Sequence, residues 1–430
     1  MKSNLFKRGF LSLVFTQFFG AANDNILKMV LTYMVIDGAW AGRLGAGGQG
    51  IVGLCFTVPF ILLSGYAGQY ADRNSKRTVS VQVKLVEIPI ALAALIGFWT
   101  GNLWITLGAL VALTSQSAFF GPAKYGMIPE LVAEGDLSRA NGTINMMTNI
   151  AVIVGTMAGG WIADRYSPQT PATGTAPDPV VWLPGAAMMA VAGVGLAAVL
   201  VMPRLVPGDR ALEYDPNPFA TYIASIREMA KTNLLLIMLA WGYFYLLAGL
   251  ALLIIPDYTV VLNVTRTEAS MILGVMAIAI GVGCAAAGLI SGHRIEPRLI
   301  PVGAGGLTAF FVLLGVVPPT FTNVCVFVVG AGFFAGFYII PLQALLQKLS
   351  PDDERGRFLG TANGVSFTFL SIASGLYWLI KPAFVTQPQR IFLISALLMA
   401  VGSGAFLHYM RKTGLRFGRT DEADLASVED

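Results

Sequence analysis

The chain of 430 residues carries only 28 Lys and Arg and 24 Asp and Glu side chains, so that 12% of its residues are charged. The usual share in a soluble domain is about 25%. Hydrophobic residues make up 55% of the chain, which excludes a disordered chain and an ordinary cytosolic enzyme and indicates an integral membrane protein. The net charge of +4 is too small to imply a nucleic-acid partner.

Twelve apolar runs are long enough to cross a bilayer, which takes about 20 mostly apolar residues per helix. A polar, proline-containing stretch at 203–232 separates the first six runs from the last six, as is typical of two-lobed transporters. The sequence therefore predicts an all-α membrane protein with twelve transmembrane helices in two six-helix lobes. The predicted spans are 10–36, 50–70, 79–99, 102–122, 140–163, 181–202, 233–256, 269–291, 299–317, 321–346, 360–380 and 390–410.

These runs divide the chain into four expected regions. They are an N-terminal lobe over 1–202, a cytoplasmic linker over 203–232, a C-terminal lobe over 233–410 and a cytoplasmic tail over 411–430. The first run is long enough to span the bilayer, so we expect it to be retained as a helix and not cleaved as a signal peptide.

The basic residues predict the orientation of the chain in the membrane. Of the 28 Lys and Arg residues, Lys28 lies within a span, five lie in the loops on one side, and the other 22 lie on the opposite side. Because cytoplasmic loops carry the excess of positive charge, both termini are predicted to be cytoplasmic. The five residues on the outer side are Arg43, Arg165, Arg266, Lys381 and Arg390.

Cysteine and histidine give no pattern of a metal or cofactor site. Cys55, Cys284 and Cys325 lie in separate apolar runs, and His293 and His408 are far apart in sequence. Neither a disulfide framework nor a zinc site is supported, and no phosphate-binding Walker loop is present. We therefore predict no cofactor, no metal, no catalytic residues and no enzymatic activity.

Four ionisable residues fall inside predicted spans: Asp24 and Lys28 in the first, and Lys84 and Glu87 in the third. Intramembrane charges are costly unless paired, so they are functional candidates. The spacings i,i+4 and i,i+3 place each acid on the same helix face as a base, where the two can pair. Their zero net charge suits a zwitterionic or amphipathic substrate. The alternatives are two structural ion pairs, or a Lys84 side chain that reaches the cytoplasmic interface.

The fifth predicted span carries a polar stripe made of Asn141, Asn145, Thr148 and Asn149. Their spacing of i, i+4, i+7 and i+8 places them on one helix face, which needs either a polar cavity or partners on neighbouring helices. Substrate contact and helix packing are both open interpretations of this stripe.

The turn between the second and third spans reads Gly-Gln-Tyr-Ala-Asp-Arg-Asn-Ser-Lys-Arg over 68–77. It resembles the signature of the major facilitator superfamily, from which Ser75 departs where that signature has a second glycine. The resemblance implies a latch that stabilises the outward-open state. In such a latch Gly68 would allow two helices to approach closely, and Asp72 would face the N-terminus of a neighbouring helix. A basic cytoplasmic loop is the simpler alternative. The latch residues would be Gly68, Asp72, Arg73, Lys76 and Arg77.

Segments 23–28, 120–131 and 140–142 narrow the resemblance. They are similar to the bacterial lysophospholipid transporter family, which also occurs as the transporter domain of fused acyltransferase and acyl-carrier-protein synthetase proteins. The resemblance covers most of the chain and is strongest over 10–165. It implies that Asp24, Asn25 and Lys124 face the substrate path, and that Lys84 matches a family lysine.

The seventh predicted span departs from this family, because Ala248 and Gly249 stand near the position where a basic residue is expected. Headgroup phosphate contacts would then fall on lysines of the N-terminal lobe. The candidate substrate-binding residues are Asp24, Asn25, Lys28, Lys84, Glu87, Lys124, Asn141, Asn145 and Asn149.

The resemblance implies a monomeric transporter of the bacterial inner membrane that moves lysophospholipid inward by alternating access for re-acylation. Its partners would be the lysophospholipid, other membrane lipids and a separately encoded acyltransferase or acyl-carrier-protein synthetase, because the acidic end of the chain (421–430) shows no such domain.

Two other functions stay open. One is a cation- or proton-coupled exporter of small amphipathic solutes, and the other is a non-transporting membrane scaffold for a lipid acyltransferase.

Overall fold

The computed structural model describes residues 7–133, 136–168, 177–205, 208, 211, 215, 217–292, 295–351 and 355–412. His293 and most of the predicted tail, 413–430, lie outside these residues. Every regular element within the described ranges is helical, and the prediction of an all-α protein is confirmed.

Among the described residues, eleven helices are long and apolar enough to cross a membrane. The 30-residue helix α1 is the remaining long helix of the described chain, and it carries the polar residues Asn23, Asp24, Asn25 and Lys28 in its second half. The long helices are α1 (Arg8–Asp37), α2 (Gly48–Arg73), α3 (Lys76–Trp99), α4 (Leu103–Leu131), α5 (Leu137–Tyr166), α6 (Leu183–Leu200), α8 (Leu234–Ile254), α10 (Arg266–Ser291), α11 (Leu299–Val316), α12 (Phe321–Leu349), α13 (Arg355–Ile380) and α14 (Ile391–Lys412).

Two stretches differ from the predicted elements. Helix α4 continues through Pro122 and Pro129 to Leu131. Proline is tolerated inside a membrane helix because groups on neighbouring helices can satisfy the backbone atoms that it leaves without a hydrogen bond. This extension places Lys124 on a helix. The predicted linker contains a further helix, α7 (Ala220–Met229), and the short elements α9 (Tyr258–Val261), η2 (Ile255–Asp257), η3 (Lys381–Phe384) and η4 (Pro388–Arg390) lie at span ends.

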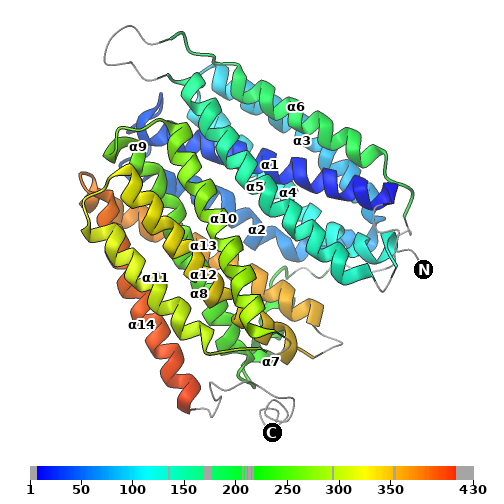
Figure 1. The fold of residues 1–430 in the computed structure, drawn as a ribbon. Helices are drawn as coiled ribbons and strands as arrows, with labels where there is room; N and C mark the ends of the chain where they lie inside the picture. The colour runs from blue at the N-terminus through cyan, green and yellow to red at the C-terminus, as the bar shows by residue number, and fades with distance from the viewer. Residues whose placement is uncertain are drawn as a thin grey trace. The chain divides into compact units, whose positions relative to one another are not determined.

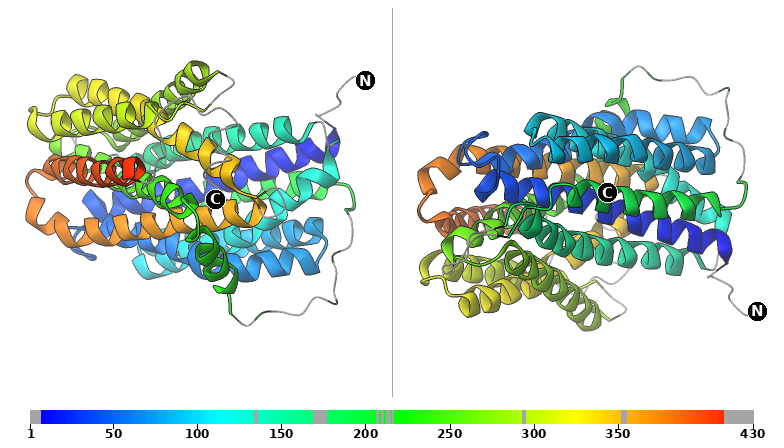
Figure 2. Two further views of the ribbon diagram at one scale, coloured as in Figure 1. Left: turned by 90° about the horizontal axis from the view of Figure 1, so that it is seen from below. Right: turned by 90° about the horizontal axis from the view of Figure 1, so that it is seen from above.

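The chain divides into two compact units. Unit 1 comprises Met1–Pro218 and Thr265–Ser270, and unit 2 comprises Phe219–Val264 and Met271–Asp430. Unit 1 thus holds α1 to α6 together with the first residues of α10. The long helices of each unit run alongside one another (Figures 1 and 2).

In unit 1, α1 is central, because it packs against α2, α4, α5 and α6. Small residues permit its contact with α5: a Cβ added at Gly155 would lie 2.5 Å from the carbonyl oxygen of Ala22, and one at Gly159 would lie 2.7 Å from Cβ of Met29. Such close approach of backbones is a common way for membrane helices to associate. It brings the polar segment of α1 into the interior of unit 1.

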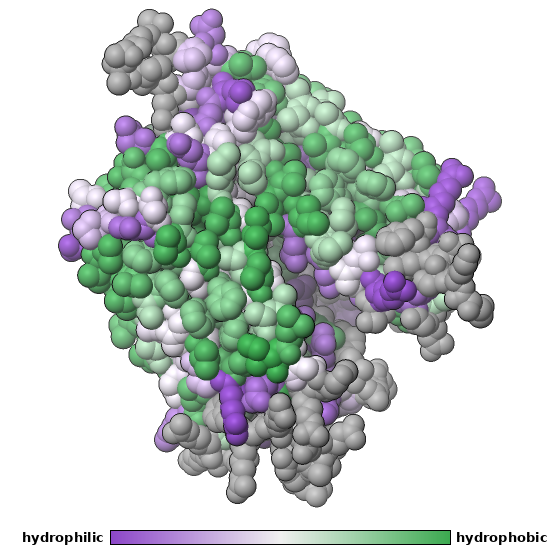
Figure 3. Space-filling view, in the orientation of Figure 1, coloured by the Kyte–Doolittle hydropathy of each residue, from purple (hydrophilic) through white to green (hydrophobic). Residues whose placement is uncertain are grey.

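In unit 2, α8 packs against α12, α13 and α14, and α11 packs against α12 and α14. Apolar side chains cover most of the visible surface in Figure 3, and hydrophilic ones gather toward the ends of helices. Large apolar side chains are exposed in both units, among them Trp104 at 69% and Leu379 at 69%. Apolar exposure on this scale fits a surface that contacts lipid.

Candidate functional site

Lys84 and Glu87 form a closed ion pair on α3. Lys84 Nζ lies 2.6 Å from Glu87 Oε2, and both side chains are almost completely shielded from solvent. The amide of Asn23 on α1 donates to the other carboxylate oxygen at 2.6 Å. The predicted pairing of Lys84 with Glu87 is therefore confirmed. Because Lys84 is 2% exposed, the alternative that it reaches the cytoplasmic interface is wrong.

Asp24 and Lys28 follow a different pattern, since each has its own partners. The hydroxyl of Ser117 on α4 donates to Asp24 Oδ1 at 3.1 Å. Lys28 donates to Asn25 Oδ1 at 3.0 Å, and its Nζ lies 4.8 Å from the ring centroid of Phe56. Within the described residues Asp24 and Lys28 make no direct ion pair, although helix spacing allows one. The competing amide and aromatic partners of Lys28 account for the difference.

Lys124 lies on the extended part of α4 and is 8% exposed. Its Nζ lies 4.6 Å from the ring centroid of Tyr125. Across the described part of the chain it has no hydrogen bond or ion pair with a protein group. An ammonium carries three donors, so this side chain can bind an anionic ligand without first breaking a hydrogen bond or an ion pair to a described residue.

The polar stripe on α5 divides into two parts. Thr148 faces the interior of unit 1, where its hydroxyl accepts from Gln17 on α1 at 2.9 Å. Asn141 donates to a backbone carbonyl of its own helix. Asn145 and Asn149 are exposed, and Tyr125 donates to Asn145 at 3.5 Å. Thr148 thus serves helix packing, whereas Asn145 and Asn149 remain open to other partners.

The basic residues of the 68–77 motif tie together the helix ends around the turn. Arg77 donates through Nε to the carbonyl oxygen of Met202 at 2.8 Å, just beyond the end of α6. Lys76 forms an ion pair with Glu130 near the end of α4, at 3.0 Å. These contacts join α3 to its neighbours within unit 1.

The other motif residues behave differently. Asp72 is exposed and has no protein partner in the described ranges. Arg73 is the last residue of α2. A Cβ added at Gly68 would meet no described heavy atom within 4 Å, so the close helix approach that was predicted at Gly68 is absent from this structure.

Unit 2 contains a buried charge group that the sequence analysis missed. Lys381 Nζ lies 2.5 Å from Asp257 Oδ2, and the hydroxyl of Tyr377 donates to the same carboxylate oxygen. Asp257 is 3% and Lys381 5% exposed. Both had been placed in loops because they follow the predicted spans 233–256 and 360–380 by one residue. The sequence signal that could have indicated this pair was an acid, Asp257, and a base, Lys381, each directly at the end of a predicted span.

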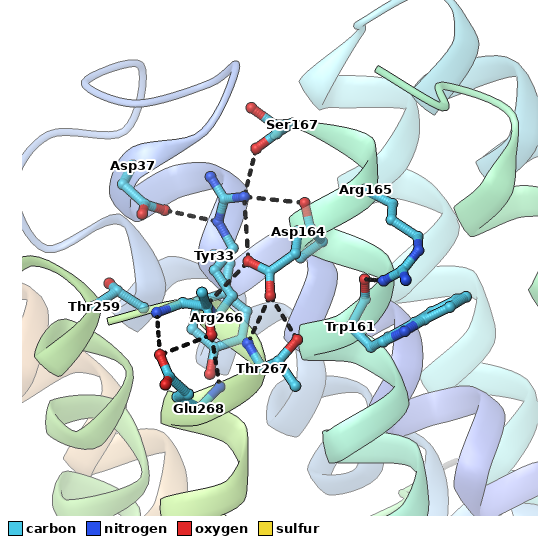
Figure 4. Close-up of polar contacts among 12 residues, drawn as sticks. Tyr33, Asp37, Trp161, Asp164, Arg165, Ser167, Thr259, Arg266, Thr267 and Glu268 are labelled. Carbon is cyan, nitrogen blue, oxygen red and sulfur yellow. Dashed lines mark hydrogen bonds and ion pairs between the residues drawn. The ribbon is translucent and has the colours of Figure 1, made fainter. Parts of the chain in front are cut away.

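Arg266 was likewise predicted to lie in an outer loop, yet it is 1% exposed within unit 1 (Figure 4). Its Nε lies 3.2 Å from Asp37 Oδ1 at the end of α1, and its Nη1 lies 3.8 Å from Asp164 Oδ1 on α5. Nη1 also donates to the carbonyl oxygens of Ala163 at 3.0 Å and Ser167 at 2.5 Å. The guanidinium therefore joins α1 and α5.

Asp164 also caps the first turn of α10. Its carboxylate accepts from the backbone nitrogens of Arg266 at 3.0 Å and Thr267 at 2.9 Å, which is the favourable place for an acid at a helix N-terminus. Gly160 makes room for this segment, because an added Cβ would collide with Ser270 Oγ. Sequence spacing could not have connected these charges, since Arg266 is 102 positions from Asp164 and 229 positions from Asp37.

Known proteins provide an independent comparison. A model of the Major Facilitator Superfamily matches residues 13–376. The lysophospholipid transporter LplT of Cronobacter sakazakii (strain ATCC BAA-894) is 29% identical over 398 residues, covering 87% of this chain and 89% of that protein. The protein of the same name from Photorhabdus laumondii subsp. laumondii is 28% identical over 356 residues, covering 80% of this chain and 81% of its own.

Solved structures show the same fold. A bacterial homolog of the human lysosomal transporter Spinster gives a TM-score of 0.69 at 13% sequence identity, covering 94% of this chain and 97% of that one. A POT family transporter in complex with 5-aminolevulinic acid gives a TM-score of 0.73 at 13% identity, covering 96% of this chain and 98% of that one.

Proposed function

Because this chain belongs to the major facilitator superfamily of membrane transporters, we propose that it moves a lysophospholipid across the bacterial inner membrane for re-acylation. The observation that carries the substrate class is Lys124, a buried ammonium that lies against the Tyr125 ring and has no hydrogen bond or ion pair among the described residues. A lysophospholipid headgroup contains a phosphate that such a point charge can bind. The relatives named lysophospholipid transporters, aligned over most of the chain, support the same substrate.

The proposed headgroup path lies in unit 1. Asp24 and Asn25 are adjacent on α1 and Lys28 lies about one turn further along. Ser117 joins Asp24 to α4, the helix that carries Lys124. A zwitterionic headgroup would place its anionic part against lysine and its cationic part against Asp24. We assign Asn141, Asn145 and Asn149 to the polar wall of the path.

In this proposal Lys84 and Glu87 do not contact the substrate but position the helix that does. Their charges neutralise each other at 2.6 Å, and Glu87 also holds the amide of Asn23. Because Asn23 precedes Asp24 on α1, the pair fixes the position of the substrate-facing turn. Their contribution to binding is thus to orient α1.

We further propose that units 1 and 2 are the two lobes of an alternating-access carrier, with the linker, the tail and both termini in the cytoplasm. The 68–77 motif would latch the outward-open state through Asp72, which is exposed here and free to meet another helix. We expect the carrier to work as a monomer and to deliver its lipid to a separately encoded acyltransferase or acyl-carrier-protein synthetase.

Uptake of labelled lysophosphatidylethanolamine into proteoliposomes tests the proposal. We expect uptake well above that of empty vesicles and above that of vesicles holding Lys124→Met. A correctly folded protein that gives no uptake would contradict lipid transport and would favour the scaffold function.

A second candidate is a cation- or proton-coupled exporter of small amphipathic solutes. It is favoured by Asp24, which is 8% exposed and, among the described residues, accepts a hydroxyl donor at Oδ1 but forms no ion pair. An imposed cation gradient that drives efflux of such a solute, without lysophospholipid uptake, would establish this candidate instead.

A further inference from the structure

The linker helix α7 is fixed to unit 2 along one side. It packs against α13 and α8 at one end of this unit (Figure 1). Ser225 and Met229 lie on the packed side and are 0% exposed. Tyr222 also contacts α13, since a Cβ added at Gly364 would lie 2.4 Å from a ring carbon of Tyr222. This packing determines which side of α7 faces away from the protein.

Another side of α7 exposes an apolar stripe. Phe219, the N-cap residue, is 37% exposed and Ile223 is 43% exposed, and Ile226 is half-buried beside them. The spacing i, i+4 and i+7 places all three on one helix face. An apolar stripe on a short helix outside the spans is typical of helices that lie along a membrane surface.

Two basic side chains border this stripe. Arg227 follows Ile223 by about one helical turn, and Lys231 follows Arg227 just beyond the end of the helix. Both are exposed, and neither side chain has a hydrogen bond or an ion pair with a described residue. Glu228, the acid of this helix, is already paired with Arg357 on α13. The unpaired charges beside the apolar stripe are therefore both positive.

The position of α7 in the chain restricts what this face can meet. Helix α8 begins at Leu234, shortly after Lys231, and it is long and apolar enough to cross a membrane. The bilayer surface is therefore within reach of α7. Because α8 already holds the helix there, the effective concentration of lipid is high and weak contacts suffice. An apolar stripe bordered by unpaired basic residues is complementary to acyl chains below anionic headgroups.

We propose that this face of α7 binds the surface of the bilayer and prefers anionic phospholipid headgroups. Phe219 and Ile223 enter the boundary between headgroups and acyl chains, while Arg227 and Lys231 contact the phosphates. Through the packing of α7 on α13, the contact holds the beginning of α13 near the membrane surface. The inference goes beyond the proposed function, because it does not depend on what the protein transports.

Quenching by spin-labelled lipid tests the contact in the full chain. Ile223→Cys, with the three native cysteines replaced by alanine, is labelled with a fluorophore and reconstituted into vesicles of phosphatidylcholine and phosphatidylglycerol. A nitroxide on the acyl chain close to the headgroup should quench this label strongly. Thr221→Cys is the matched control, because Thr221 is also exposed but points to the opposite side of α7. A label there should be quenched much less.

The preference for anionic lipid is measured with spin-labelled phosphatidylglycerol and spin-labelled phosphatidylcholine as alternative quenchers of the label at position 223. Arg227→Gln should lower the relative affinity for phosphatidylglycerol about fivefold, a change of about 1 kcal/mol. Lys231→Gln should lower it by a similar factor. Both side chains are exposed, so the variants should fold like the wild type. Arg139→Gln removes another exposed charge, on α5, and should leave the relative affinity unchanged.

Strong quenching at position 223, with a preference for phosphatidylglycerol that falls in Arg227→Gln and Lys231→Gln, supports the proposal. Equal quenching at positions 223 and 221 overturns it and would favour an acidic protein surface as the partner of this face. A preference that both variants retain, or that Arg139→Gln also loses, overturns it as well. Because no transport is measured, these outcomes are independent of the uptake experiment.

Discussion

Two groups of charges in unit 1 are buried to a similar degree but are satisfied to different degrees. Around Lys84 and Glu87, each charge has an oppositely charged partner at 2.6 Å, and Asn23 completes the carboxylate. Around Asp24 and Lys124, no opposite charge is bound directly within the described residues. Both groups contain a buried acid and a buried lysine, so burial alone does not separate structure from function. What differs between the two groups is whether each charge has an oppositely charged partner.

The largest effect should come from breaking the closed pair with Glu87→Gln. Removing one partner leaves the Lys84 ammonium buried without its counter-charge, which costs about 3–5 kcal/mol. We expect a large loss of folded protein and a lower unfolding temperature in detergent. The double variant Lys84→Met with Glu87→Gln should recover much of the stability, since no charge is then left unpaired. Equal stability of Glu87→Gln and the wild type would show that the pair is not the structural element described here.

A smaller effect on folding but a strong one on transport is expected for Asp24→Asn. The substitution keeps the shape and a hydrogen-bond acceptor for Ser117, while it removes the charge. Hydrogen bonds to charged groups contribute about 1.5–3 kcal/mol, so lipid uptake should fall at least about tenfold. Membrane insertion and thermal stability should stay close to the wild type. Uptake at the wild-type rate would place Asp24 with Lys84 and Glu87 as a structural charge.

Lys124→Met should act on substrate affinity more than on stability. Its ammonium, which lies over the Tyr125 ring, has no described hydrogen bond or ion pair to lose, and its apolar stem is replaced by a side chain of similar length. We expect KM for lysophospholipid to rise about tenfold, with little change in the unfolding temperature. Lys76→Met is a useful contrast, because it breaks the ion pair with Glu130 at 3.0 Å and should not change KM. A stability loss in Lys124→Met without a KM change would contradict the assignment.

The smallest effect on stability is expected for Asp72→Asn. The side chain is exposed, and substitutions at such sites usually change stability by about 0.5 kcal/mol or less. A latch that forms in another state of the cycle would nevertheless be weakened, so turnover should fall while the unfolding temperature stays the same. Unchanged turnover would argue for the simpler interpretation of a basic loop.

The fold could be predicted from the sequence because the bilayer restricts which structures can span it. Each run of about 20 apolar residues must satisfy its backbone hydrogen bonds internally, which leaves the helix as the available structure. The predicted spans accordingly agree with the long helices. The predicted span 102–122 is shorter than helix α4, which continues through Pro122 and Pro129 to Leu131. Helix α7 was missed because the linker was judged by its prolines and charges.

Only part of the candidate site could be predicted from the sequence. The i,i+3 pairing of Lys84 with Glu87 is a local property of one helix and was predicted. The contact between Ser117 and Asp24 joins residues 93 positions apart, so no spacing rule reaches it. The same holds for Lys381 with Asp257, whose burial depends on how α13 and α8 pack.

The sequence by itself determined that this protein is a helical membrane protein and where most of its helices lie, because these depend on local composition and helical period. Only the tertiary structure decided which charges are neutralised. Ion pairing and hydrogen bonding act over about 3 Å between helices, and that distance is set by packing, as in the approach of α5 to α1 at Gly155. Packing therefore separates Lys84, which is neutralised by Glu87, from Asp24 and Lys124, which remain available to a ligand.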